Sequence, residues 1–157
     1  MKTEVFKLLK INEKELTFAP ITREDLNKLS ILYEDLTGRN SNINKMHTIF
    51  PVIESNNDYY LYKVEHKGIL VGTIMGIICH EICAECEPFL VVEDVVVRKD
   101  YRRKHIGKFM FEQIEKIAKE RGCYISILVS SYRHPEAHIF YEEIGFTDPV
   151  KGFRKKL

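Results

Sequence analysis

The stretch VVEDVVVRKDYRRKHIGK, residues 91–108, carries the main information about this fold. Its first seven residues are apolar apart from Glu93 and Asp94, a composition typical of a buried strand. Lys and Arg then dominate, and apolar residues follow at helical spacing as far as Gly122. These apolar positions are Ile106, Phe109, Met110, Ile114, Ile117 and Ala118. The stretch therefore predicts a strand, a basic turn and an amphipathic helix.

The basic turn has the chemistry of an anion site. The first-turn amides of a helix have no acceptor inside the helix, and the helix dipole favours negative charge beside them. Arg102, Arg103, Lys104 and Lys108 add positive charge at the same place. Gly107 is the only glycine of the stretch, so the spacing is neither a dinucleotide fingerprint nor a P-loop. We expect a pyrophosphate as the bound group.

The rest of the chain alternates between strand and helix patterns. The patterns predict a strand at 16–20, a helix at 23–36 capped by Thr22 and Asp25, and a weaker helical pattern at 43–53 broken by Pro51. They next predict a hairpin at 59–79 turning at Lys67-Gly68 and strands at 89–97 and 124–129. A helix at 136–144 closed by Gly145 and one or two strands within 146–157 complete the chain. This order indicates a mixed α/β (α+β) sheet with antiparallel hairpins and one βαβ unit, residues 89–129.

Size and composition narrow the class of protein. The 157 residues suit one domain, and no apolar run approaches the roughly 20 residues of a membrane helix. A net charge of +1 offers no overall basic field for nucleic acid or an anionic membrane. The N-terminal residues lack the pattern of a secretory signal, so we expect a cytoplasmic protein without nucleic-acid or membrane partners.

Three of the four cysteines, Cys79, Cys83 and Cys86, lie close together with His80 between them. A zinc site is one interpretation, but such sites usually pair two ligands with two more about a dozen residues away. Reduced cysteines beside a hairpin are the other interpretation, and we predict no metal.

Two motifs stand out, RRKHIG at 102–107 and AHIFYEEIGF at 137–146. The first is similar to the signature Arg/Gln-x-x-Gly-x-Gly/Ala, and the second to A-x-x-F-Y-E-K-x-G-F. Both are motifs of the GNAT superfamily of acetyl-CoA-dependent N-acetyltransferases, which this sequence therefore resembles. The resemblance covers roughly residues 59–157. It implies a GNAT-like fold, whose central, mostly antiparallel sheet is splayed between two strands and has helices on both faces. It also implies a single domain over 1–157, with an N-terminal extension at 1–14 and an acetyl-CoA-binding core at 59–157.

The resemblance assigns roles to particular residues. Acetyl-CoA would contact Val95, Val96, Val97, Arg102, Arg103, Lys104, His105, Ile106, Gly107 and Lys108. Val95 and Val97 would offer backbone groups to the pantetheine arm, and Tyr141 would lie near the coenzyme sulfur. His105 occupies the position of the first signature glycine, so a positive φ there would strain its backbone.

The implied reaction is acetyl transfer to a primary amine, by direct attack with help from a general base. Glu93 interrupts an apolar strand, which raises a carboxylate pKa towards the range of a base, whereas strand alternation turns Asp94 to the opposite face. Tyr141 can donate its phenolic proton to the leaving thiolate. The expected acceptor is a small-molecule amine, and a homodimer is possible. The alternative is an acyl-CoA-binding sensor or interaction domain without catalysis.

Overall fold

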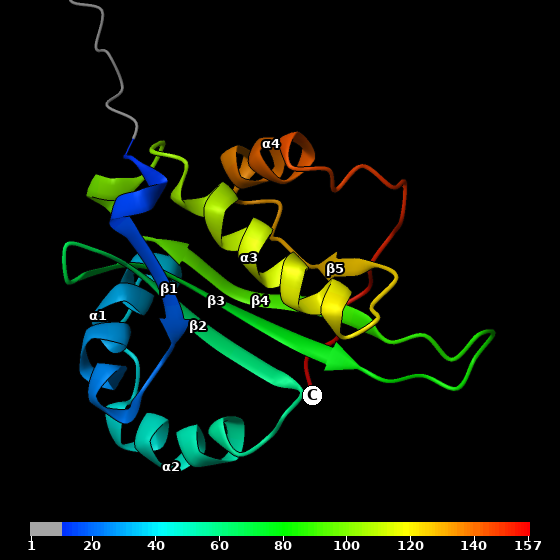
Figure 1. Ribbon diagram of the computed structural model, residues 1–157, viewed down its shortest axis with the longest axis horizontal. Coiled ribbons are helices and arrows are strands. Elements are labelled where there is room, and N and C mark those ends of the chain that lie inside the picture. The colour runs from blue at the N-terminus through cyan, green and yellow to red at the C-terminus, as the bar shows by residue number, and fades with distance from the viewer. Residues whose placement is uncertain (1–10) are drawn as a thin grey trace, which may run out of the picture. The chain divides into compact units, whose positions relative to one another are not determined.

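A sheet with three long antiparallel ladders forms the centre of residues 11–127 (Figure 1). The computed structural model describes residues 11–157 and divides the chain into two compact units after Ile127. In the first unit the elements are β1 (Leu16–Pro20), α1 (Leu26–Thr37), α2 (Ile43–Glu54), β2 (Tyr59–His66), β3 (Ile69–Cys79), β4 (Phe89–Val97), α3 (Ile106–Glu120) and the start of β5 (Ser126–Leu128). The second unit, Leu128–Leu157, contains α4 (Pro135–Glu143).

Strands β4 and β5 complete the predicted βαβ unit. The N–H of Leu90 donates to the Ile125 carbonyl at 2.9 Å, and that of Tyr124 donates to the Pro88 carbonyl at 3.1 Å. Residue numbers rise together along the two segments, so they run parallel. The result is a mixed sheet in the order β1-β2-β3-β4-β5, which confirms the predicted fold class.

Local signals place several elements where the sequence predicts them. The hairpin turn uses Lys67 and Gly68, both at positive φ (51° and 78°), as a two-residue turn requires. At the start of the first helical segment, the N–H and hydroxyl of Thr22 donate to the Asp25 carboxylate at 2.9 and 3.0 Å. A short 3₁₀ turn therefore leads into α1, and Gly38 ends the helix at a φ of 71°.

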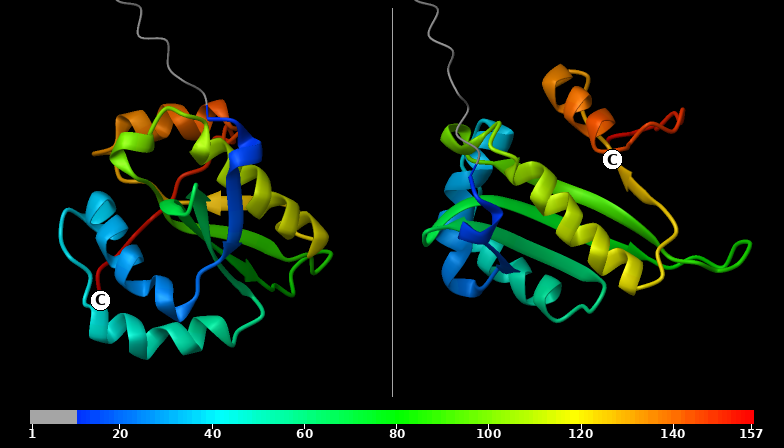
Figure 2. Two further views of the ribbon diagram at one scale, coloured as in Figure 1. Left: turned by 60° about the vertical axis from the view of Figure 1, so that its left-hand side comes forward. Right: turned by 45° about the horizontal axis from the view of Figure 1, so that its top comes forward.

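Helices cover both faces of this sheet, α1 and α2 on one and α3 on the other (Figure 2). The first face buries Leu26, Leu29 and Leu32 of α1 with Phe50 and Val96. On the second face α3 lies close to β3, because Gly72 and Gly76 present no side chain to it. A Cβ on Gly76 would lie 2.9 Å from Ile114 atoms, and one on Gly72 would lie 3.0 Å from the Met110 sulfur.

Strand β4 contains one more residue than its partner. Met75 pairs with Glu93 and Thr73 pairs with Val96, so two residues of β4 lie opposite Ile74 alone. Asp94 takes a φ of 52° in this bulge. The bulge changes the buried face of β4: Leu90 packs towards Ile114 of α3, whereas Val96 joins the α1 core.

Two expectations were wrong. Pro51 does not break the second helix, which continues to Glu54, because buried Phe50 and half-buried Ile53 hold that turn by packing. Residues 146–157 contain no strand. They begin in local turns instead, with the N–H of Thr147 donating to Gly145 and that of Val150 to Asp148, and Pro149 lacks the N–H that a ladder needs.

Helix α4 ends where the sequence predicts. Gly145 has a φ of 108°, its N–H donates to the Glu142 carbonyl at 3.1 Å, and the N–H of Phe146 donates to the Tyr141 carbonyl at 3.0 Å. This pair of bonds is a Schellman cap. In residues 11–157, no helix combines the length and the apolarity needed to cross a bilayer.

The single domain over 1–157 with its binding core at 59–157, and the splay between two strands, stay predictions. Of the predicted N-terminal extension, residues 1–10 lie outside the described residues.

Candidate active site

The turn after β4 is held in shape by its own cations. Arg98 donates twice to the Asp100 carboxylate, at 2.7 Å each. The Arg102 guanidinium donates to the Val97 carbonyl at 3.1 Å, and the Lys104 ammonium donates to the Asp100 carbonyl at 2.9 Å. These contacts fix the backbone of the turn before any ligand arrives.

Tyr101 anchors this turn to the hairpin. Its ring lies beneath two cations, 5.3 Å from the Arg98 guanidinium carbon and 4.9 Å from the Lys104 nitrogen. The ring of His66 meets it edge-on, with centroids 5.7 Å apart. The turn is therefore packed against the end of β2.

The N-terminus of α3 presents free amides, as the sequence predicts. The first helical bond runs from the N–H of Phe109 to the His105 carbonyl at 3.0 Å, so the N–H groups of residues 106–108 have no acceptor inside the helix. Lys108 is 60% exposed, and its distant contact with Glu112, at 3.7 Å, leaves the ammonium accessible. Amides, dipole and mobile cations together suit a doubly charged phosphate group.

His105 has the positive φ that would strain the backbone of any residue with a Cβ. Its φ is 66° and its ψ is 6°, immediately before α3, and Arg103 has a φ of 60°. Left-handed backbone is unfavourable for any residue with a Cβ, although less so for His than for branched residues. Glycine would adopt this left-handed backbone conformation without strain.

Backbone groups of β4 point away from β3 at alternate residues. The N–H of Arg98 donates to the Val71 carbonyl at 2.9 Å, and Val96 pairs with Thr73. Val97, lying between these positions, therefore directs its N–H and C=O groups away from β3, and the Val97 carbonyl accepts from Arg102. Val95 lies in the bulge, so the direction of its backbone groups stays a prediction. Val96 turns its backbone to β3 and buries its side chain in the α1 core, so its expected contact with the coenzyme stays a prediction.

Two adjacent carboxylates lie at the bulge of β4, with Asp94 inside it and Glu93 just before it. Desolvation raises the pKa of Glu93, and the charge of Asp94 raises it further. Desolvation also raises the pKa of Asp94. Both residues stay open to solvent, so either can exchange a proton with a bound molecule.

Strand alternation does not place Asp94. Glu93 pairs with Met75, which faces α1 because neighbouring Gly76 faces α3. The positive φ of Asp94 interrupts the alternation on which its opposite orientation was predicted. The face that Asp94 occupies therefore stays a prediction.

Tyr141 belongs to the second unit. Its ring packs against Phe140 and Phe146 on either side, with centroid distances of 5.5 and 6.1 Å. The role of Tyr141 near the coenzyme sulfur stays a prediction.

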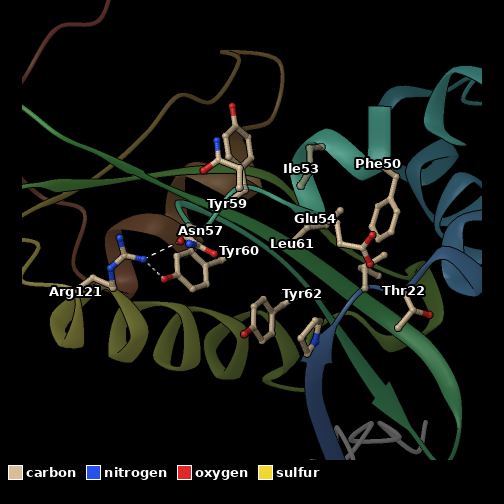
Figure 3. A pocket seen from close by; sticks show the side chains of 13 residues that line it. Thr22, Phe50, Ile53, Glu54, Asn57, Tyr59, Tyr60, Leu61, Tyr62 and Arg121 are labelled. Atoms are coloured by element: carbon tan, nitrogen blue, oxygen red, sulfur yellow. Dashed lines mark hydrogen bonds between the residues drawn. The ribbon is translucent and has the colours of Figure 1, made fainter. Parts of the chain in front are cut away.

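A cavity of about 710 Å³ in the first unit escaped the sequence analysis (Figure 3). It surrounds the part of β2 that extends beyond β1 and is lined by Pro20, Ile21, Thr22, Phe50, Ile53, Glu54, Asn56, Asn57, Tyr59, Tyr60, Leu61, Tyr62 and Arg121. The Arg121 guanidinium donates to the Asn57 carbonyl at 2.8 Å, to Asp58 at 2.6 Å and to the Tyr60 hydroxyl. The aromatic cluster at 59–62 was the available signal, but it reads equally well as strand packing.

Among residues 11–157, no cluster of His, Cys, Asp or Glu suits a metal ion. Of the predicted site residues, the β4 carboxylates and the basic turn lie on one continuous segment. The cysteines are not part of that segment.

Comparisons with known proteins point the same way. The sequence profile of the acetyltransferase (GNAT) family matches residues 26–146. The glucosamine 6-phosphate N-acetyltransferase of Candida albicans is 33% identical over 91 residues, 57% of this chain and 59% of that protein. Glucosamine 6-phosphate N-acetyltransferase 1 of Dictyostelium discoideum is 28% identical over 138 residues, 83% of this chain and 84% of that protein.

A solved structure supports the same relationship. The glucosamine-6-phosphate N-acetyltransferase of Arabidopsis thaliana superposes with a TM-score of 0.79 at 25% identity, over 90% of this chain and 97% of the other. The chain spans less than two thirds of the Candida relative's length, at 59%.

Replacing His105 by glycine tests the strain before α3. We expect His105→Gly to raise the free energy of unfolding by about 0.5–1 kcal/mol, because glycine adopts positive φ freely. His105→Ala is the matched control: it keeps a Cβ and should lower stability. Urea unfolding of the three proteins measures both changes, and equal stability of the Gly and Ala variants would contradict a strained backbone.

Proposed function

The chain belongs to the acetyltransferase (GNAT) family, and we propose that it moves an acetyl group from acetyl-CoA to a primary amine of a small molecule. One observation carries the proposal. Strand β4 bears two carboxylates with raised pKa values and leads directly into a turn whose amides and cations suit a pyrophosphate.

We propose that the turn holds the coenzyme. The free amides of 106–108 and the charges of Arg102, Arg103, Lys104 and Lys108 would bind the pyrophosphate. His105, Ile106 and Gly107 would contribute the backbone of that cradle. Backbone groups of Val95, in the bulge, and of Val97, directed away from β3, would bond to the pantetheine arm beside Val96. The self-supporting contacts of Arg98, Arg102 and Lys104 support this role, because a preformed turn loses less entropy on binding.

We propose Glu93 as the general base. An amine near neutral pH is mostly an ammonium ion, which cannot attack a thioester until it loses a proton. The amine nitrogen then forms a bond to the acetyl carbonyl carbon, the carbon–sulfur bond breaks, and Glu93 holds the proton directly or through water. Asp94 would keep the pKa of Glu93 raised, so that this carboxylate accepts a proton closer to working pH.

Tyr141 is the proposed donor to the leaving thiolate. Its phenol is a suitable acid for a thiolate sulfur, and it occupies the aromatic position of the second family motif. The Schellman cap that includes its carbonyl fixes the end of α4 around it.

For the acceptor we propose an amino sugar phosphate as the first class to test. This proposal is supported by similarity alone: the Candida and Dictyostelium relatives and the Arabidopsis structure are all glucosamine 6-phosphate N-acetyltransferases. The alternative function, an acyl-CoA sensor, predicts coenzyme binding without acetyl transfer. The homodimer, the cytoplasmic location and the absence of nucleic-acid and membrane partners stay predictions.

An acceptor panel tests the activity. With acetyl-CoA we expect thiol release to be fastest with glucosamine 6-phosphate, slower with glucosamine, and absent with the N-acetylated sugar, which has no free amine. Thiol release is followed by absorbance, and mass spectrometry identifies the product. If calorimetry shows coenzyme binding while no amine in a broad panel releases thiol, the sensor function is correct instead.

Gly107→Glu tests the coenzyme site. A carboxylate on the first turn of α3 would repel the pyrophosphate, so we expect coenzyme A affinity to fall by at least about ten-fold at low salt. Gly107→Ala separates bulk from charge and should retain binding, and Gln113→Glu adds the same charge farther along α3. Calorimetry measures all three variants. Unchanged affinity in Gly107→Glu would move the pyrophosphate elsewhere.

Glu93→Gln tests the base. Gln keeps the shape but cannot accept the proton, so kcat/KM should fall by roughly 100 to 10,000 near neutral pH and by less as the pH rises and neutral amine accumulates. Because folding raises the pKa of Glu93, its charge disfavours the fold above the unfolded pKa, so the variant should be at least as stable at pH 7. Exposed Glu120→Gln is the charge-matched control. Parallel pH–rate profiles for wild type and Glu93→Gln would assign the base to another group.

A further inference from the structure

The loop between β3 and β4 contains two exposed thiols that the proposed reaction does not use. Residues 80–88 read HEICAECEP, and Cys83 and Cys86 are both free and exposed. The loop extends well past the ends of both strands (Figures 1 and 2). Ile82, next to Cys83, is 97% exposed. Reagents in solution can therefore reach both sulfurs.

A tight turn sets the spacing of the two thiols. The N–H of Cys86 donates to the Cys83 carbonyl at 2.9 Å, closing a four-residue β-turn. The Cα atoms at the ends of such a turn lie within about 7 Å, and disulfides join Cα atoms about 4.4–6.8 Å apart. The backbone already holds the two cysteines within disulfide range, so little chain entropy is lost on forming the bond.

The other thiols differ in environment. Cys79 and Cys123 are half-buried, and the pKa of the Cys123 thiol is raised by burial, with a smaller contribution from Cys79. The Cys123 thiol therefore forms a thiolate less readily and reacts more slowly. Among residues 11–157 no cluster suits a metal, so the loop pair is a dithiol rather than part of a larger ligand set.

Charge around the pair selects its reaction partner. Glu81, Glu85 and Glu87 lie in the loop, which contains no Lys or Arg, and Glu81 also accepts a hydrogen bond from the Tyr124 hydroxyl at 3.2 Å. His80, at the start of the loop, lies 3.3 Å from the Asp58 carboxylate. The field at the thiols is therefore negative, which repels anionic reagents and attracts cationic ones.

We propose that Cys83 and Cys86 form a reversible intraloop disulfide by exchange with small disulfides, and that neutral or cationic disulfides react in preference to anionic ones. One thiolate attacks a reagent sulfur, so a mixed disulfide forms and the first reagent thiolate leaves. The second cysteine then attacks its neighbour's sulfur and releases the second reagent thiol. The two cysteines lose two electrons and two protons, and the reagent disulfide gains both as two thiols.

The test compares three disulfides of different charge on the full chain. Cystamine is cationic, 2-hydroxyethyl disulfide is neutral and glutathione disulfide is anionic. After quenching with iodoacetamide, peptide mass spectrometry should show one bond joining Cys83 to Cys86. Cystamine should react about ten-fold faster than glutathione disulfide at low ionic strength, and the difference should shrink in 0.5 M salt.

Variants separate the proposal from its rivals. Cys83→Ser and Cys86→Ser should each stop at a mixed disulfide with the reagent, whereas Cys79→Ser and Cys123→Ser should leave the reaction unchanged. The double variant Glu85→Gln/Glu87→Gln should lose most of the charge preference; Glu81 stays intact because it contacts Tyr124. A Cys79–Cys123 bond, an intermolecular bond, or one zinc ion bound tightly by the reduced loop would each overturn the proposal, as would equal rates for all three disulfides.

Discussion

The extra residue in β4 is the constraint on which the rest of the first unit depends. Leu90 must pack against α3 and Val96 against α1, although an unbroken strand would put two even-numbered residues on the same face. The insertion opposite Ile74 resolves this conflict, and it does so with Asp94 in left-handed backbone. Because Asp94 lies in the bulge, strand alternation cannot place its side chain.

The region around the end of β4 combines close packing with strained backbone. Gly72 and Gly76 let α3 lie close to β3, which positions the helix N-terminus directly after the strand. Around that junction the backbone is strained at Asp94, Arg103 and His105, and partial desolvation raises the pKa of two solvent-accessible carboxylates. Proteins keep such features where a site needs them and offset them by packing elsewhere. The concentration of strain and perturbed pKa values at the end of β4 is an independent sign that this segment has a function.

Charge is organised separately in different parts of the first unit. The turn at 98–108 gathers cations, whereas the loop at 80–88 gathers carboxylates, and the two segments are connected through β4. A chain with a net charge of +1 can thus present an anion site at one end of a strand and an anion-repelling loop at the other. The cavity beside Tyr60 and Arg121 belongs to neither of these charged segments, since the Arg121 guanidinium is already paired with the Asp58 carboxylate.

Sequence by itself determined the features that depend on local chemistry. The Lys67-Gly68 turn, the Thr22 and Asp25 cap, the Gly145 end of α4 and the free amides before Phe109 each depend on residues a few positions apart, so their patterns are legible without a fold. The two family motifs identified the superfamily for the same reason. Only the tertiary structure decided that α2 continues through Pro51, that the C-terminal residues form no strand, and that β4 has a bulge at Asp94. These outcomes depend on contacts between segments distant in sequence: Phe50 in the α1 core, the partner that a strand needs for its hydrogen bonds, and the mismatch of one residue between β3 and β4. No local pattern contains a partner's register, because the free energy that selects it comes from burying both strands together.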